Sequence, residues 1–283
     1  MKTFWLILVT IVWGSTFLII KDTVTTVNEF LIVFIRSSLA FVAILAYQLY
    51  KDWKPLFNKR NFIYGSIMGV LMAITYGAQT IGLKYTSTGH SAFITSSAVI
   101  IVPFILFIFF HDKLFKIDII SVLIVFAGLF MLTYDFETKM NIGDIITIIT
   151  AISYAFHVIL AGRFVKKSDT IPIVTYQFLS AAIIGIIAFL ITNNEPVMIS
   201  DKAWFSMIYL GLVGTLFCYF IAVWIQKYVS SLKVTIIFSL EPVFAAIFGY
   251  FIIHEILNTK ELIGAILILA GVMVHSILKR SKN

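Results

Sequence analysis

The chain has 283 residues, of which 60% are hydrophobic and only 12% are charged, and its mean hydropathy is +1.02. A soluble domain carries about 25% charged residues, so this composition excludes the soluble classes and is typical of a polytopic α-helical membrane protein. The formal net charge of +7 is compatible with a nucleic-acid partner, but the basic residues lie in short connections between apolar segments, where they indicate membrane orientation.

Ten segments are apolar for long enough to cross a bilayer, which takes about 20 residues of helix. In chain order, the predicted spans are 4–22, 30–50, 61–83, 88–110, 117–134, 143–163, 171–191, 203–226, 233–253 and 260–278. The first span follows Lys2 as a signal peptide would, but it lacks a small-residue cleavage site, so we expect a retained helix. All the connections are too short to hold a soluble catalytic domain.

The distribution of basic residues predicts the orientation of the spans. When alternate connections are assigned to opposite sides, one side collects 15 Lys and Arg residues and the other collects 5, with Arg36 inside a span. The positive-inside rule then places both the N- and the C-terminus in the cytoplasm, which requires an even number of spans.

The second half of the chain repeats the first at an offset of 143 residues. The matches include Tyr76 with Tyr219, Ser96 with Ser239, and His111-Asp112 with His254-Glu255, while an offset of 141 pairs Arg36 with Gln177. Each predicted unit, 4–134 and 143–278, holds five helices, and an odd number makes the two units cross the membrane in opposite senses. The fold class is therefore expected to be all-α, with ten transmembrane helices as two inverted five-helix repeats. Such repeats are typical of secondary transporters that alternate access around a midplane site.

The ninth predicted span carries Glu241 and Pro242 near its middle. A carboxylate in hydrocarbon costs about 2.5–3.5 kcal/mol on insertion scales, and a proline removes a helical N–H group and crowds the preceding turn. A charge and a helix break together at membrane depth indicate a cavity beside the helix. The alternatives are a carboxyl group that is kept protonated and a kink that only serves packing.

The first half differs from the second at this level. Ala98 and Val99 stand opposite Glu241 and Pro242, and the proline of the first half, Pro103, lies one turn further on. We expect both prolines to mark helix breaks that act as gating elements. The charge, in contrast, comes from one half only.

Counting 1.5 Å of rise per residue places other polar and aromatic side chains in two layers that bracket the membrane centre. The candidate substrate- or proton-binding residues are Glu241, Arg36, His157, Gln177, Tyr219, Tyr154, Trp13, Tyr76, Ser96 and Gln79. Each has an alternative role. Arg36 could anchor a helix end, and His157 could serve only in packing. The aromatic residues could contact lipid, and the two glutamines could form hydrogen bonds between helices.

Several motifs resemble those of EamA-type proteins in the drug/metabolite transporter superfamily. They are Trp13-Gly-Ser-Thr-Phe17, Lys84-Tyr-Thr-Ser-Thr-Gly-His-Ser-Ala-Phe93, Leu240-Glu-Pro-Val243, and His254-Glu255 followed by Gly264 and Gly271. The resemblance covers essentially the whole chain as two tandem units. It implies ten helices and the movement of small metabolites, often amino acids or related compounds and commonly outward. These motifs are specific for the family and say almost nothing about the substrate.

We therefore expect a secondary transporter in the cytoplasmic membrane that exports a small polar or amphipathic metabolite. Glu241 would hold the ammonium group of the substrate or a coupling proton, and Arg36 would meet a carboxylate. An uptake carrier for a nutrient or an organic cation is the nearest alternative, and a non-transporting scaffold is a remote one. The chain has no ATP-binding Gly-x-x-x-x-Gly-Lys motif, so active transport would draw on gradients.

An enzymatic function is not expected. The chain contains neither His-Glu-x-x-His nor Gly-x-Ser-x-Gly, and the single cysteine, Cys218, has no evident catalytic partner and excludes a cysteine-based metal site. No cofactor, metal or nucleic acid is therefore predicted. The expected partners are a small-molecule substrate, the lipid bilayer and protons as a candidate coupling ion, and the oligomeric state is left open.

Overall fold

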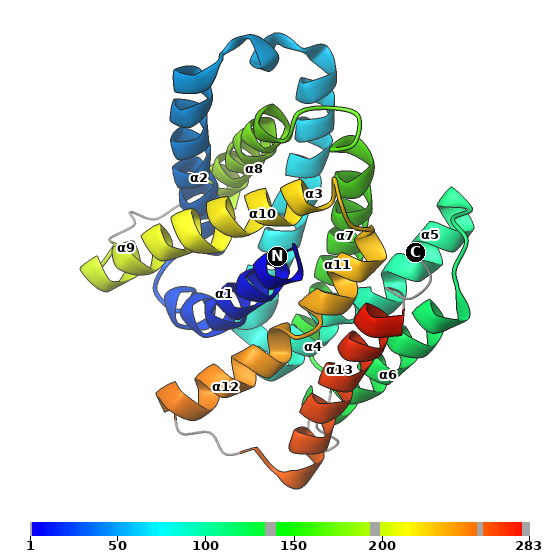
Figure 1. Cartoon of the computed structure of the whole chain (residues 1–283). Helices are drawn as coiled ribbons and strands as arrows, with labels where there is room; N and C mark the ends of the chain where they lie inside the picture. The colour runs from blue at the N-terminus through cyan, green and yellow to red at the C-terminus, as the bar shows by residue number, and fades with distance from the viewer. Residues whose placement is uncertain (1, 134–139, 193–198, 254–256, 279–283) are drawn as a thin grey trace.

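A computed structural model of the chain describes residues 2–133, 140–192, 199–253 and 257–278 (Figure 1). Within these ranges every regular element is a helix, and ten helical segments are long and apolar enough to cross a membrane. The predicted all-α class and the ten predicted spans are confirmed, and the predicted helix ends agree with the structure to within two residues. The inverted orientation of the two units and the cytoplasmic termini stay predictions.

Seven spans are continuous α-helices and three are composite. The continuous ones are α1 (Lys2–Thr23), α2 (Glu29–Lys51), α3 (Lys59–Tyr85), α6 (Lys116–Thr133), α7 (Ile142–Phe164), α8 (Thr170–Thr192) and α13 (Thr259–Leu278). The composite ones are α4 (Thr88–Ser96) with α5 (Ala98–Phe110), α9 (Asp201–Ile208) with the π-helical segment η2 (Tyr209–Phe217) and α10 (Cys218–Ile225), and α11 (Ser231–Phe238) with α12 (Glu241–Ile253). A short 3₁₀-helix, η1 (Lys54–Phe57), lies in the connection between α2 and α3.

Polar side chains fix several helix starts, where the first backbone N–H groups have no partner within the helix. Asn28 accepts hydrogen bonds from two N–H groups of α2. Asn141 and Asp144 form a capping box at the start of α7, in which each side chain accepts a hydrogen bond from the backbone N–H of the other. Ser87 and Ser230, which are 143 residues apart, cap α4 and α11 in the same way.

The helices of the two halves pack against one another rather than forming two separate bundles. In Figure 1, α6 runs beside α13, and further contacts join α2 to α8, α3 to both α7 and α8, and α1 to α10, α11 and α12. The α6–α13 contact is close enough that a Cβ built on Gly264 would lie 2.4 Å from the backbone nitrogen of Leu132. A buried pair, His275 Nε2 and Asp118 Oδ1 at 3.1 Å, also joins these two helices. Small residues and buried polar pairs of this kind are typical of helix association in membranes.

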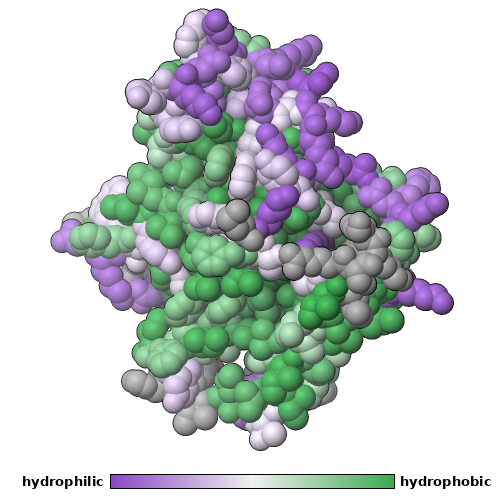
Figure 2. Space-filling view, in the orientation of Figure 1, coloured by the Kyte–Doolittle hydropathy of each residue, from purple (hydrophilic) through white to green (hydrophobic). Residues whose placement is uncertain are grey.

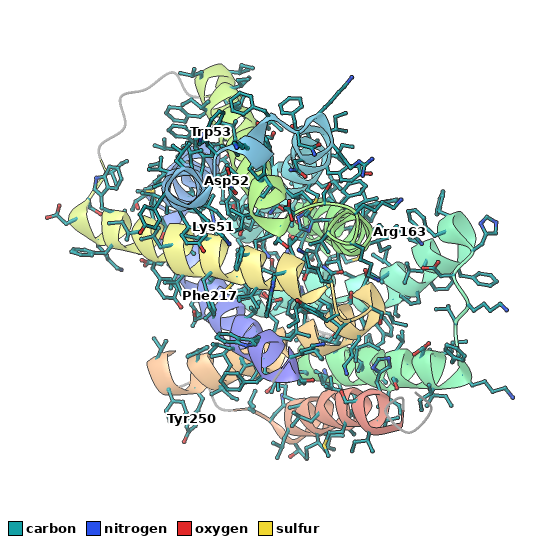
Figure 3. All side chains as sticks on the ribbon, turned by 45° about the horizontal axis from the view of Figure 1, so that its top comes forward. Lys51, Asp52, Trp53, Arg163, Phe217 and Tyr250 are labelled. Atoms are coloured by element: carbon teal, nitrogen blue, oxygen red, sulfur yellow. The ribbon has the colours of Figure 1, made fainter. Side chains whose placement is uncertain are left out.

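The surface divides by polarity. Figure 2 shows hydrophilic residues gathered at the end of the molecule that carries the α2–α3 connection, above a broad apolar surface. Lys51, Asp52 and Trp53 lie together in this connection, whereas Tyr250 lies at a distant edge of the molecule on α12 (Figure 3). The apolar surface carries large exposed side chains such as Phe109, which is 66% exposed. This division suits a protein whose sides face lipid and whose ends face water.

Two spans are interrupted at equivalent positions. The first break lies at Ser97, between α4 and α5, and the second lies at Ser239 and Leu240, between α11 and α12. In both, a serine hydroxyl donates a hydrogen bond to a carbonyl of the preceding turn: Ser97 to Ile94 O at 2.6 Å, and Ser239 to Thr235 O at 3.0 Å. Such bonds compete with the helical backbone pattern and often bend membrane helices.

The two prolines relate differently to these breaks. Pro242 is the second residue of α12, directly after the break, in the first helical turn where a proline is well tolerated. Pro103 lies inside α5, six residues beyond the break at Ser97. The predicted helix break at Pro103 is therefore wrong, because the interruption of this span lies at Ser97. His254 and Glu255, which the repeat and the motifs include, lie outside the described residues.

Candidate functional site

Seven of the ten predicted site residues line one small cavity between the two halves. Its lining consists of Trp13, Thr16, Arg36, Thr75, Tyr76, Gln79, Thr95, Tyr154, Tyr219 and Glu241. Members of both predicted polar layers therefore meet in a single space. The cavity measures only about 30 Å³, which is enough for a water molecule or two.

Glu241 lies at the break before α12, and its side chain faces the cavity while the residue is only 8% exposed. Among the described residues, none forms a hydrogen bond or an ion pair with its carboxyl group. Tyr154 and Cys218 are within electrostatic range of this carboxyl group. A buried carboxyl group without a protein partner is well placed to accept a proton or a cationic group of a ligand.

Arg36 is the largest fully buried side chain in the described structure, at 1% exposure. Its Nε donates a hydrogen bond to Thr215 Oγ1 at 2.9 Å, and its guanidinium carbon lies 3.6 Å from the centre of the Tyr76 ring. The Tyr76 hydroxyl lies 3.2 Å from the same threonine oxygen. Stacking on an aromatic face and a hydroxyl partner hold the guanidinium without neutralising it. Its buried Nη1 has no hydrogen-bond partner among the residues that the structure describes.

The two charges share the cavity without pairing with each other. No ion pair within 4.0 Å is formed between Arg36 and Glu241. A buried charge without a partner costs several kcal/mol, and a ligand group of opposite charge would remove that cost. The arrangement is therefore suited to a ligand that carries both an anionic and a cationic group.

Aromatic rings form one wall of the cavity around Trp13. The Trp13 ring makes edge contacts with Tyr154, Tyr219 and Phe238, with ring centres 6.1, 5.3 and 4.9 Å apart. Its Nε1 donates a hydrogen bond to the carbonyl oxygen of Gly214 at 2.9 Å, which lies in the π-helical segment η2. π-Helical turns occur frequently at functional sites. This wall offers an apolar surface with a fixed orientation.

Three predicted residues, His157, Gln177 and Ser96, do not line the cavity. The His157 ring lies behind the wall, edge-on to Tyr219 with ring centres 5.1 Å apart, and no described residue forms a hydrogen bond with its buried Nε2. Gln177 donates a hydrogen bond to Met72 Sδ at 3.2 Å. The Ser96 hydroxyl is buried without a partner beside the first helix break.

Four threonines belong to the site and were not predicted. Thr16, Thr75 and Thr95 line the cavity, and Thr215 holds Arg36. Threonine gives a weak signal within a membrane span because its hydroxyl can bond to its own helix, as that of Thr16 does to Trp13 O. Two of them had a usable signal, since Thr16 lies in the Trp13-Gly-Ser-Thr-Phe17 motif and Thr95 precedes Ser96.

Unpaired polar atoms surround the cavity. Within the described parts of the chain, no hydrogen-bond partner reaches the buried atoms Arg36 Nη1, Thr95 Oγ1 and the Tyr154 hydroxyl. The same holds for the nearby atoms His157 Nε2 and Ser96 Oγ. An unpaired buried polar group costs about 1–3 kcal/mol. Such a concentration is typical of a place that water or a polar ligand occupies.

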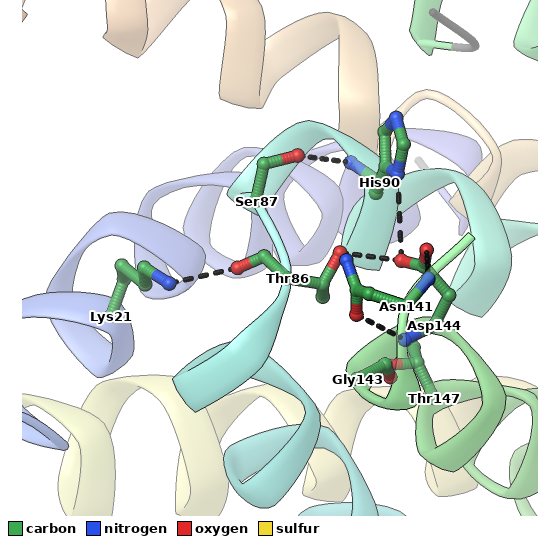
Figure 4. A network of polar contacts seen from close by, with 8 residues as sticks. All are labelled: Lys21, Thr86, Ser87, His90, Asn141, Gly143, Asp144 and Thr147. Carbon is green, nitrogen blue, oxygen red and sulfur yellow. Dashed lines mark hydrogen bonds and ion pairs between the residues drawn. The ribbon is translucent and has the colours of Figure 1, made fainter. Parts of the chain in front are cut away.

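A second polar cluster, at the end of α3, is tied up within the protein (Figure 4). Asp144 is 1% exposed, caps α7 with Asn141, accepts a hydrogen bond from Thr86 Oγ1 at 2.5 Å, and lies 3.4 Å from His90 Nδ1. Lys21 Nζ donates to the carbonyl oxygen of Thr86 at 2.8 Å. The carboxylate of Asp144 is thus engaged in contacts between helices, in contrast to that of Glu241.

Comparison with known proteins gives a consistent picture over the whole chain. The model of the EamA-like transporter family matches residues 1–134 and 141–277. An uncharacterized transporter of Archaeoglobus fulgidus is 27% identical over 272 residues, covering 96% of this chain and 84% of the relative. The uncharacterized transporter YoaV of Bacillus subtilis is 23% identical over 281 residues, covering 96% and 95%. A crystal structure with 16% sequence identity superposes with a TM-score of 0.82 and covers 100% of this chain and 98% of the other, which shows the same fold.

Proposed function

Because the chain belongs to the EamA-like transporter family, we propose that it exports small zwitterionic metabolites, such as amino acids, by alternating access. The family establishes a membrane transporter of the drug/metabolite type that spans the bilayer several times. The bacterial relative supports the cytoplasmic membrane as its location. The substrate class rests on the chemistry of the cavity.

One observation carries the substrate class: the guanidinium group of Arg36 and the carboxyl group of Glu241 line the same cavity and do not pair with each other. A molecule with a carboxylate and an ammonium group on one carbon would meet both. A monocarboxylate or a monoamine would leave one protein charge buried without a partner, which costs about 2–5 kcal/mol. The site thus favours zwitterions over singly charged analogues of the same size.

The remaining walls support a metabolite with an apolar or amphipathic side chain. Trp13, Tyr154 and Tyr219 present rings, while Thr16 and Gln79 present small polar groups at the edge of the cavity. Binding sites for small molecules are mostly apolar with a few placed polar groups. Side-chain preference would therefore follow ring contact, and the charged pair would set the orientation.

The cavity must widen for a substrate to enter, since about 30 Å³ holds no amino acid. The two helix breaks adjoin it, because Thr95 precedes the first break and Glu241 follows the second. We infer that the units 4–134 and 143–278 move against each other about these breaks, with Pro242 at the hinge and α5, including Pro103, moving as a rigid piece. A cavity of this size is the one expected of a closed intermediate of such a cycle. Glu241 would hold a proton when no substrate ammonium is bound, which couples export to a proton gradient.

A flux experiment in proteoliposomes tests the proposal. Vesicles containing the purified full chain are loaded with radiolabelled leucine, isoamylamine or 4-methylpentanoate, which share a side chain and differ in charge. We expect leucine to leave at least about 30-fold faster than either analogue, with an inward proton gradient raising its efflux. Equal efflux rates for the three compounds would contradict the zwitterion assignment. Gradient-driven accumulation of leucine inside the vesicles would indicate uptake rather than export.

A further inference from the structure

A basic hollow of about 530 Å³ opens at the end of the molecule that carries the α2–α3 connection. Arg60, Lys166, Lys167 and Lys227 line it, and Asp169 is the acid among its lining residues. In the parts of the chain that the structure describes, none of these four cations forms an ion pair. Cations gathered around one space repel each other, and an anion bound among them would relieve this repulsion.

The backbone around the hollow adds to this preference. The first turn of α3 lies at its edge, where Asn58 caps the helix by accepting a hydrogen bond from Arg60 N at 2.9 Å. Arg60 Nη1 reaches across to the carbonyl oxygen of Lys167 at 3.5 Å and joins the α3 wall to the α7–α8 connection. The start of a helix carries a partial positive charge and free N–H groups, both of which favour an anionic ligand.

Exposed aromatic residues place this end of the molecule at the membrane interface. Tyr50, Trp53 and Phe57 are 90%, 53% and 79% exposed, and the rings of Trp53 and Phe57 make an edge contact with centres 5.5 Å apart. Trp53 lies beside Lys51 in the α2–α3 connection (Figure 3). Amphipathic rings next to basic groups are typical of segments at the level of lipid headgroups.

A second hollow of about 460 Å³ adjoins the first, because Asp169 and Lys227 line both. It lies between α2 and α10 at the start of α8, and Lys51 and Asp52 line it together with Tyr47, Phe220 and Trp224. One end of the combined space is therefore strongly basic, and the other is walled by aromatic rings. This polarity matches a molecule with an anionic head and a hydrocarbon tail.

We propose that the joined hollows bind one anionic phospholipid. Its phosphodiester lies among Arg60, Lys167 and Lys227, and the first part of its chains runs between α2 and α10 along Phe220 and Trp224. A soluble phosphate compound fits only the first hollow, whereas the aromatic second hollow and the exposed rings favour a lipid. The bound lipid joins the ends of α2, α3 and α10, which stabilises the folded protein independently of transport.

Thermal unfolding of the purified full chain in detergent tests this proposal with three additives. Dioleoyl phosphatidylglycerol, dioleoyl phosphatidylcholine and sn-glycerol 3-phosphate are added at equal phosphate concentrations, since a ligand that binds the folded state raises the Tm. We expect phosphatidylglycerol alone to raise the Tm of the wild type. The double variant Arg60→Gln/Lys167→Gln should require at least about tenfold more phosphatidylglycerol for the same shift.

The matched control, Lys113→Gln/Lys116→Gln, removes one charge from the α5–α6 connection and one from the start of α6, and it should respond like the wild type. A second double variant, Lys166→Gln/Lys227→Gln, keeps Arg60 in place and tests the same hollow if the Arg60→Gln/Lys167→Gln variant fails to fold. Equal lipid responses in all variants would overturn the proposal in favour of general surface charge. An equal Tm rise with glycerol phosphate would show that the hollow binds a free anion rather than a lipid. The absence of a rise with phosphatidylglycerol would show that it is not a lipid site.

Discussion

The two interrupted spans, α4–α5 and α11–α12, break at equivalent positions but present different chemistry to the cavity. After the second break α12 starts with Glu241 and Pro242, whereas α5 starts after the first with Ala98 and Val99. A serine hydroxyl bonds to the preceding turn at both breaks. Because the first break exists without proline or charge, the interruption belongs to the shared architecture, and the carboxyl group is an addition made by one half.

The positive charge shows the converse distribution. Arg36 lies on α2 in the first half, and its counterpart in the second half is the neutral Gln177 on α8, which lies outside the cavity lining. Each half therefore supplies one charge at a position where the other half is neutral. Two nearly symmetric units produce a site with a direction, in which a zwitterion binds in one orientation.

Removing the added carboxyl group should have the largest effect of the changes considered. We expect Glu241→Gln to lower zwitterion flux by about two orders of magnitude, because a ligand ammonium then lacks its partner at a cost of about 2–5 kcal/mol. The glutamine keeps the volume and polarity of the side chain, so the Tm should stay close to that of the wild type. Counterflow of labelled leucine in proteoliposomes measures the effect.

The matched control lies at the equivalent position of the other break. Ala98→Ser adds a polar atom to α5 where Glu241 lies in α12, and it should change flux by less than about threefold. If both variants were equally impaired, the breaks themselves would limit transport and the charge would have no special part. Undiminished flux in Glu241→Gln would remove this residue from the site.

Replacing the charge of the first half should have a smaller and more selective effect. We expect Arg36→Gln to weaken binding of carboxylate-bearing substrates about 10- to 100-fold and of amines much less, since only the former lose a charged partner. Arg36→Lys keeps the charge but loses the planar group that stacks on Tyr76 and bonds to Thr215, so it should restore binding in part. Competition of unlabelled carboxylates and amines against leucine counterflow measures both. Equal losses for the two ligand classes would indicate that Arg36 only holds α2 to η2.

The spans and most of the site could be predicted because they rest on local features of the sequence. Apolar length defines the ten helices, and polar residues such as Arg36 and Glu241 at membrane depth are costly enough to mark the site. The count of helical rise gave depths for ten candidate residues, which needs no knowledge of their partners, and seven of the ten line the cavity.

The features that sequence reasoning missed depend on packing between distant segments. Thr215 becomes important only because the fold brings it to Arg36, 179 residues earlier in the chain. His157 has the right depth but lies behind Tyr219, because depth does not determine which way a helix face turns. The break at Ser97 was assigned to Pro103 since proline is the stronger local signal, although a serine bonded to Ile94 O accompanies the actual break.

The smallest effect is expected from removing proline at the second break. Pro242 lies in the first turn of α12, where its missing N–H has no helical partner to lose, so Pro242→Ala should leave the break in place and change flux by less than about threefold. Pro103→Ala offers the contrast, because a proline inside a helix costs up to about 3 kcal/mol relative to alanine. It should therefore raise the Tm, while Pro242→Ala should leave the Tm nearly unchanged. Thermal unfolding and leucine counterflow on both variants separate these expectations. A more than tenfold loss of flux in Pro242→Ala would mean that the second break depends on its proline after all, and that the two interruptions arise from different causes.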